Sequence, residues 1–155
     1  MQDELPPPTQ NGFGIFACKI DGNAWISDRG IFIIAGGVKS DSLDVLGKRK
    51  DQEGNIETLI IRLFGSFKFT QKVYQLNDTT TSYAIYVRNG SNPCFAQPGP
   101  GYGNTITKKI SEGTLEITKA DTMGRILSGI FQFKIPTDVC DTLLVTDGRF
   151  DIKYQ

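Results

Sequence analysis

The chain has 155 residues, with 17 basic residues balancing 17 acidic ones and no histidine. This length suits a single domain that buries about two-thirds of the surface its unfolded form exposes, and the balanced charge argues against a nucleic-acid-binding protein. Without histidine the chain lacks the commonest general base and the commonest ligand for zinc or copper, so we expect no metal and no other cofactor.

The first residues are polar and rich in proline. Pro6, Pro7 and Pro8 stand in succession, which favours an extended polyproline conformation, and no charged region followed by an apolar stretch marks a signal peptide. We therefore predict a stiff tether over residues 1–12, with an ordinary disordered terminus as the alternative. A single all-β domain is predicted over residues 13–155.

Strand patterns and turn signals alternate through the first half of the chain. Asp21-Gly22-Asn23 and residues 51–55 are turn signals that predict two hairpins, and the basic run Lys48-Arg49-Lys50 is expected at a solvated hairpin tip. Residues 56–64 carry apolar side chains on both faces, which predicts a strand covered on both sides for part of its length. The longest apolar run, 31–35, is much shorter than the ~18 residues of a membrane-spanning helix. The predicted strands cover residues 13–20, 24–26, 31–35, 43–47 and 56–64.

The C-terminal part carries the clearest alternation with a period of two. In residues 113–118, apolar side chains share one face and polar side chains share the other, which is typical of a half-buried strand. The last strands predict a β-meander, with Asp147-Gly148 forming a bulge or tight bend. The predicted strands in the second half cover residues 67–76, 82–88, 113–118, 126–135, 143–145 and 150–152.

These patterns predict an all-β fold, either an antiparallel β-sandwich or a partly closed β-barrel, built from hairpins and the C-terminal meander. Trp25 is expected to fill the core beside the first hairpin rather than to serve as a ligand platform. The predicted core contains Phe13, Phe16, Trp25, Ile60, Leu115, Ile117, Phe131, Phe133 and Phe150.

Three cysteines are too few for a disulfide framework and wrongly spaced for zinc. Cys18 lies inside an apolar strand and is expected as a buried, inert thiol. Cys94 and Cys140 lie in turn-like segments, so one disulfide between them is a hypothesis for an oxidising compartment.

Residues 89–104 form a long predicted loop rich in glycine and proline. Loops of this length inside a compact domain are uncommon and often functional, although a tolerated surface insertion is the alternative. The loop contains Phe95 and Tyr102, and exposed aromatic rings can stack on a sugar or pack into a partner. We therefore predict Phe95 and Tyr102 as ligand contacts.

Four acidic residues, Asp138, Asp141, Asp147 and Asp151, lie near the C-terminus. Two carboxyl groups at a suitable separation suffice for glycoside hydrolysis, so a carboxylate-dependent hydrolase is one hypothesis. Aspartate is also common in turns, where it hydrogen-bonds the local backbone, and this simpler interpretation is favoured. Arg149 is expected to pair with Asp147 and Asp151 along one face of a strand. The acids lack the regular spacing of a dedicated calcium loop, and no catalytic residue is assigned.

The chain resembles a domain-of-unknown-function family of Bacteroidota (Bacteroides-type) secreted lipoproteins. The resemblance covers nearly the whole chain, and its most specific part is the closing motif Asp147-Gly148-Arg149-Phe150-Asp151-Ile152-Lys153-Tyr154. It implies a secreted protein that is anchored by a lipidated cysteine upstream of the proline-rich segment, and no activity. The other stretches that carry it are residues 4–12, 16–25, 113–119 and 126–133.

Together these observations predict a non-catalytic binding or interaction module at the cell envelope, in the periplasm or at the outer membrane. We expect a protein or glycan partner, no nucleic acid, and membrane attachment only through an N-terminal lipid anchor that this chain does not contain. The alternatives are the carboxylate-dependent hydrolase, using Asp147 or Asp151, and a small β-barrel that encloses an apolar ligand.

Overall fold

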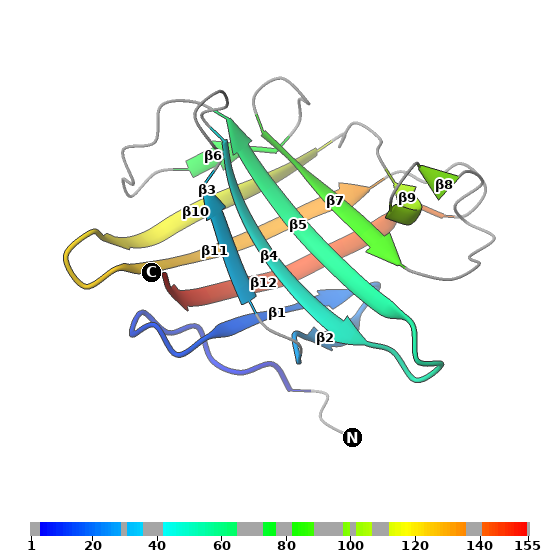
Figure 1. Ribbon diagram of the computed structural model, residues 1–155, viewed down its shortest axis with the longest axis horizontal. Helices are drawn as coiled ribbons and strands as arrows, with labels where there is room; N and C mark the ends of the chain where they lie inside the picture. Colours follow the sequence, from blue (N-terminus) through cyan, green and yellow to red (C-terminus); the bar gives the residue numbers. More distant parts are fainter. Residues whose placement is uncertain are drawn as a thin grey trace.

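The computed structural model is a β-sandwich of two antiparallel sheets, which we name sheet A and sheet B (Figure 1). The strands of one sheet cross those of the other in Figure 1, as in packed twisted sheets. The predicted sandwich is confirmed, and the two sheets do not close into a barrel. The described residues include no helix of the length and apolar character needed to cross a membrane. The structure describes residues 4–28, 31–35, 42–64, 73–76, 82–88, 98–99, 102–106, 112–135 and 141–154.

Sheet A contains the predicted C-terminal meander, extended by the first hairpin on one side and by a short strand on the other. The two turn residues Asp21 and Gly22 both have positive φ, as the predicted Asp-Gly hairpin requires. In spatial order the strands are β2 (Asn23–Ile26), β1 (Ile15–Ile20), β12 (Leu143–Lys153), β11 (Ile126–Ile135), β10 (Glu112–Asp121) and β6 (Val73–Gln75).

Sheet B contains the second predicted hairpin, in which Lys50 faces Ile56 across the turn 51–55. The predicted strand over 82–88 is also confirmed. The predicted loop 89–104 is partly wrong, because strand structure occurs within it at residues 98–99 and from Tyr102 onward. In spatial order the strands are β3 (Ile31–Ala35), β4 (Ser42–Lys50), β5 (Ile56–Phe64), β7 (Ser82–Arg88), β9 (Tyr102–Ile106) and β8 (Pro98–Gly99).

The core lies between the two sheets and is centred on aromatic rings from sheet A. The ring of Phe131 lies 5.3 Å from that of Phe16 and 5.8 Å from that of Phe133, measured between centroids. From β1, the Phe16 ring reaches across to Gly47 of β4, where a Cβ atom would lie only 2.7 Å from Cδ1 of the ring. The missing side chain at Gly47 therefore lets an aromatic ring of one sheet rest directly on the backbone of the other.

Most of the predicted core is confirmed. The predicted residues that are buried are Phe16, Trp25, Leu115, Ile117, Phe131, Phe133 and Phe150. Phe13 is a wrong prediction, since it is 67% exposed. It precedes β1 between Gly12 and Gly14, whose positive φ values interrupt the regular alternation of an extended strand. Ile60 is only half-buried, because β5 turns its neighbours Leu59 and Ile61 into the core instead.

Strand β12 is one strand of 11 residues where the sequence predicted two short strands. The predicted bulge at Asp147-Gly148 is present, because β12 shifts register there against both β1 and β11. Asp147 rather than Gly148 has the positive φ, at 52°. Gly148 is needed for space instead, since a Cβ atom there would lie 2.3 Å from the ring of Phe131.

Residues 4–14, which we name the N-terminal strap, lie against sheet A. The side chain of Arg149 donates a 2.9 Å hydrogen bond to the carbonyl oxygen of Pro6, and Lys119 Nζ donates a 2.8 Å bond to that of Gln10. In Figure 1 the blue trace runs beside β1 and reaches the side of the molecule where the chain ends. Hydrogen bonds therefore hold the strap against the domain, and the domain boundary predicted after residue 12 stays a prediction.

The cysteine predictions are tested at one position. Cys18 is a free thiol that is fully buried in the core, as predicted, and burial raises its pKa to about 12. Such a thiol is protonated and unreactive at neutral pH. Cys94 and Cys140 lie outside the described residues, so the disulfide between them stays a prediction.

Candidate functional site

The face of sheet A that points away from sheet B, which we name the outer face, carries the polar half of each alternating strand. In β10, Leu115 and Ile117 point into the core, so that Thr114 and Glu116 point outward. Antiparallel pairing then places these outward residues in rows that cross neighbouring strands. One row consists of Gln75, Thr114 and Gln132, and the next consists of Val73, Glu116, Ile130 and Arg149.

Two adjacent depressions lie over these rows, and together we name them the outer hollow. One, of about 430 Å³, is bordered by Pro8 of the strap and includes the second row together with Asp147. The other, of about 410 Å³, includes Gln75, Lys134 and Leu144. Thr114 and Gln132 line both depressions, so the two form one continuous surface.

The outer hollow combines exposed apolar side chains with polar ones that make no side-chain bond to any described residue. No side-chain hydrogen bond or ion pair within the described part of the chain involves Gln75, Thr114, Glu116 or Gln132. Ile130 keeps 41% of its surface exposed on the neighbouring strand. Outward polar groups therefore stand free here, whereas those near the strap are bonded to it.

The bulge in β12 sets the position of Arg149 at the edge of the outer hollow. Its Nε and Nη2 atoms donate hydrogen bonds of 3.0 Å and 2.9 Å to the carbonyl oxygen of Asp147, while Nη1 donates to Pro6. The carboxylate of Asp147 lies 3.6 Å from Lys19 Nζ instead. The predicted salt bridges from Arg149 to Asp147 and Asp151 are therefore wrong, because the bulge turns the Asp147 carbonyl toward the guanidinium.

Asp151 accepts more hydrogen bonds than any other acid in the described ranges, and it fastens the strap. The residue is 1% exposed. It accepts hydrogen bonds from the hydroxyls of Thr9 (2.6 Å) and Ser128 (2.7 Å). It also accepts bonds from the backbone amides of Asn11 (3.0 Å), Gly12 (2.8 Å) and Phe13 (3.1 Å). Burial alone would raise the pKa of Asp151, but these donors overcome that effect and hold it at about 2.

This bonding bears on the predicted role of Asp151 in hydrolysis. A general acid must carry a proton at working pH, and a nucleophile must reach the substrate. Asp151 is ionised well below neutral pH and its oxygens face the strap. It is placed to hold structure, as the favoured interpretation of these acids expected.

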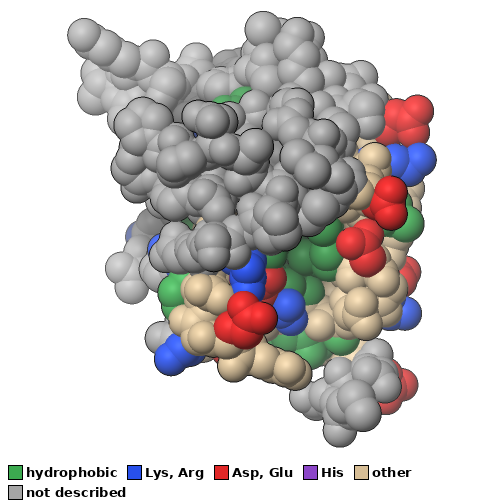
Figure 2. Space-filling view, turned by 90° about the vertical axis from the view of Figure 1, so that its right-hand side faces the viewer, with side chains coloured by type: hydrophobic (Ala, Val, Ile, Leu, Met, Phe, Trp, Pro, Cys, Tyr) green, Lys and Arg blue, Asp and Glu red, His purple; other side chains and the backbone are tan. Residues whose placement is uncertain are grey.

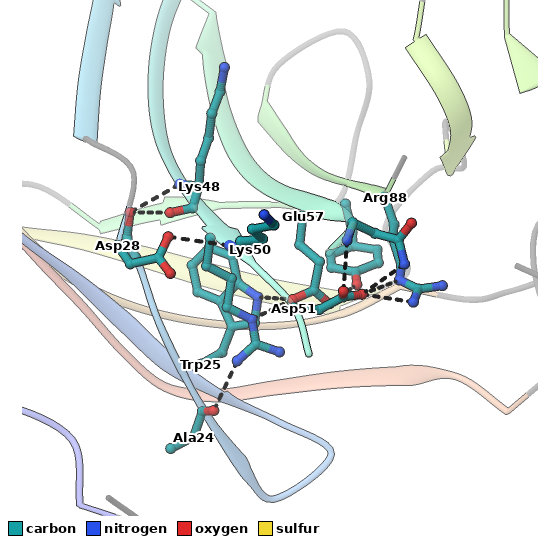
Figure 3. A network of polar contacts seen from close by, with 12 residues as sticks. Ala24, Trp25, Asp28, Lys48, Lys50, Asp51, Glu57 and Arg88 are labelled. Carbon is teal, nitrogen blue, oxygen red and sulfur yellow. Dashed lines mark hydrogen bonds and ion pairs between the residues drawn. The ribbon is translucent and has the colours of Figure 1, made fainter. Parts of the chain in front are cut away.

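A second buried carboxylate, Glu57 of β5, joins the two sheets at one end of the core (Figure 3). Oε2 accepts hydrogen bonds from the indole nitrogen of Trp25, at 3.2 Å, and from Nε of Arg49. Oε1 accepts one from the hydroxyl of Tyr86, and burial, followed by this bond, raises the pKa of Tyr86. The guanidinium of Arg49 also lies over the Trp25 ring, at 5.4 Å from its centroid. Trp25 is thus a core residue, as predicted.

The predicted solvated tip at Lys48-Arg49-Lys50 is wrong for Arg49, which is bonded to Glu57 and to the carbonyl oxygen of Ala24. The tip of this hairpin is held by an ion pair between Arg88 Nη2 and Asp51 Oδ2, which are 2.7 Å apart. Figure 3 shows this pair beside the contacts of Glu57. In Figure 2, which views the molecule from the right-hand side of Figure 1, basic and acidic side chains adjoin apolar ones.

The predicted contact residues are not part of this geometry. Phe95 lies outside the described residues, and Tyr102 is described only as the first backbone position of β9. No sequence pattern indicates the outer hollow as a whole, although the alternation in residues 113–118 correctly predicts which of their side chains point outward. Among the described residues, no group of three or more potential metal ligands is placed to hold an ion.

Comparisons with protein-family models, with curated proteins and with solved structures find no match to this chain. The resemblance to envelope lipoproteins therefore stays a prediction. What the outer hollow can bind follows from the side chains that line it.

Proposed function

We propose that the protein is a non-catalytic binding module of the bacterial cell envelope, and that the outer hollow is its contact surface. The observation that carries this proposal is a group of four polar side chains beside the exposed Ile130 that form no side-chain bond with the described residues: Gln75, Thr114, Glu116 and Gln132. Hydrogen-bonding groups next to an apolar surface in a concave site are typical of ligand recognition.

The sheet beneath the outer hollow supports this role because it fixes the side chains in place. β11 pairs along its length with both β10 and β12, and β10 pairs with β6 at the two rows. Sites on paired strands are held more precisely than sites on loops, which lowers the entropic cost of binding.

The state of the buried acids supports a role without catalysis. The side chain of Asp151 is bonded to the strap and that of Glu57 to Trp25, Arg49 and Tyr86, so both carboxyl groups hold the structure together. The envelope location rests on the sequence resemblance and on the lipidated cysteine that the resemblance implies. Phe95 and Tyr102 remain a second predicted contact.

A binding screen with two sets of variants tests the proposed function. The immobilised protein is exposed to a glycan array and to detergent extracts of bacterial envelopes, and retained partners are identified by mass spectrometry. We expect a specific partner whose retention is lost in Ile130→Asp and is kept in the surface control Gln52→Ala. Loss in Phe95→Ala/Tyr102→Ala, with retention in Ile130→Asp, would contradict the outer hollow as the contact surface and favour the second predicted contact. Failure to retain any partner from either source, or turnover of a substrate by purified protein, would overturn the proposal.

The envelope location is tested separately. We expect the full gene product, expressed in a Bacteroidota host, to fractionate with membranes and to incorporate labelled palmitate. Recovery of unlabelled protein from the cytosol would contradict the envelope location.

A further inference from the structure

We infer that the outer hollow binds a neutral carbohydrate, an inference that rests on the proposed function and names its ligand class. Three properties of the described side chains lead to it: their hydrogen-bonding types, their charges and the position of the apolar groups.

The hydrogen-bonding types suit vicinal hydroxyl groups. The amides of Gln75 and Gln132 each offer donors and an acceptor, the hydroxyl of Thr114 offers both, and the carboxylate of Glu116 accepts. A sugar hydroxyl is itself both donor and acceptor, so it can bond to every member of this set. Because the side chains come from adjacent strands about 4.8 Å apart, they can contact successive hydroxyls of one or two sugar rings.

The charges argue against an anionic ligand. Lys134 and Arg149 line the outer hollow together with the acids Glu112, Glu116 and Asp147, so the basic side chains do not exceed the acidic ones. Lys134 lies 3.5 Å from Glu112 Oε2. The guanidinium of Arg149 donates from Nε and both terminal nitrogens to carbonyl oxygens of the chain. A phosphate, sulfate or uronate group would meet the unbonded Glu116 instead of a free cation.

Apolar groups lie beside the polar ones in the same row. Val73 and Ile130 lie on either side of Glu116 in the same row, and they are 52% and 41% exposed. Sugar rings have C–H faces between their hydroxyls, and these faces pack on apolar side chains. An extended peptide would bind a sheet mainly through backbone hydrogen bonds at an edge. At the centre of the outer hollow the backbone of β11 is paired on both sides, which favours a ligand read by side chains.

The test is a titration followed by two-dimensional amide NMR of the isotope-labelled protein. The probes are neutral trisaccharides of glucose, mannose, galactose, xylose and N-acetylglucosamine in α and β linkage, with trigalacturonate as the anionic counterpart. We expect at least one neutral probe to shift the amide signals of Thr114, Glu116, Ile130 and Gln132. Raising NaCl from about 50 to about 500 mM should leave that affinity within about twofold, because a neutral ligand is not screened.

Variants connect the binding to the side chains. Gln132→Ala and Glu116→Gln should each weaken the best neutral probe by about tenfold, the loss expected for one or two good hydrogen bonds. Gln52→Ala, an exposed glutamine in the β4–β5 turn, should bind as the unaltered protein does. Matching amide spectra away from the substitution would show that the variants are folded.

The outcomes separate the two proposals. Binding of trigalacturonate alone, or a neutral probe that shifts only amides outside the outer hollow, would overturn the carbohydrate inference and leave the binding module standing. Capture of a protein partner that Gln132→Ala abolishes, without any sugar binding, would do the same. If neither sugars nor envelope proteins bind, both proposals fail.

Discussion

Ser128 and Asp151 face each other across β11 and β12, and the Ser128 hydroxyl donates a 2.7 Å hydrogen bond to Oδ1 of Asp151. The pair is buried under the N-terminal strap, which supplies the remaining donors to the same carboxylate. An ionised side chain inside a protein is tolerated when its lone pairs are filled. This acid therefore couples the fold of sheet A to the placement of residues 4–14.

Replacing Asp151 by Asn should release the strap and lower the free energy of unfolding by about 2 to 4 kcal/mol, since a buried charge-assisted network is broken and strap amides lose their acceptor. Urea unfolding measures this change. Proteolysis should also become faster at residues 4–14.

Asp147→Asn is the matched control for that substitution. Asp147 is exposed, and its Oδ2 atom forms a surface ion pair with Lys19 Nζ at 3.6 Å. Because such pairs contribute little, its replacement should change the free energy of unfolding by less than about 0.5 kcal/mol. Equal unfolding midpoints for the two variants would show that the Asp151 bonds do not stabilise the fold.

Stability should fall as the pH is lowered from about 4 to about 2. The pKa of Asp151 is about 2 in the folded protein, whereas an unfolded aspartate has a pKa of about 3.9. The unfolded state therefore takes up the proton first, and the stabilisation present above the unfolded pKa, about 2 kcal/mol, is lost as the pH approaches the folded pKa. Urea midpoints measured from pH 6 to pH 2 check this, and Asp151→Asn should have a shallower slope.

Asp51 contributes to the same pH range and must be distinguished. Its pKa is also about 2, because burial raises the pKa by less than the hydrogen bonds from Arg88 and Asn55 lower it. Asp51→Asn should remove its own share of the slope and leave the strap protected from protease. A pH slope unchanged in both variants would contradict the assignment.

How far the sequence predicted this molecule depends on the range of the interactions involved. The alternation in β10 and β11 depends on neighbouring residues, and it correctly placed Leu115, Ile117, Phe131 and Phe133 in the core. The bonds from the strap to Asp151 join residues about 140 positions apart. No local pattern marks them, so a proline-rich start was interpreted as a tether.

The candidate site shows the same limit. Outward side chains of residues 113–118 could be assigned from period two, but their neighbours in the rows, such as Val73 and Ile130, depend on strand order and register. Glu57 likewise has partners from β2, β4 and β7. The sequence around Glu57 is that of an apolar strand, and it does not indicate these partners. The sequence analysis predicts Phe95 and Tyr102 as contacts because the composition of a loop can be read from the sequence, whereas strand order and register cannot.

The Glu57 network can be followed through Trp25, the single tryptophan of the chain. Glu57→Ala leaves the Trp25 indole N–H, the Tyr86 hydroxyl and the Arg49 guanidinium without their shared acceptor. We expect a loss of about 3 kcal/mol in the free energy of unfolding and a shifted Trp25 emission maximum. Glu53 has a side chain that is 75% exposed, so Glu53→Ala should change the free energy of unfolding and the Trp25 emission only slightly. Similar effects of Glu57→Ala and Glu53→Ala would contradict a structural role for Glu57.

The contact between Phe16 and Gly47 predicts a steric coupling between the two sheets. A Cβ atom at residue 47 would lie 2.7 Å from Cδ1 and 2.8 Å from Cγ of the Phe16 ring, which is closer than side chains pack. Gly47→Ala should therefore destabilise the protein by about 1 to 3 kcal/mol, the usual cost of overpacking.

A double-mutant cycle separates this clash from a backbone effect of the new alanine. Phe16→Ala alone should also be destabilising, because it removes a buried ring. In the Phe16→Ala/Gly47→Ala variant the Cγ and Cδ1 atoms that would meet the new methyl group are absent, so the combined loss should be smaller than the sum by about 1 kcal/mol or more. Strict additivity in urea unfolding would mean that the ring of Phe16 does not rest on Gly47.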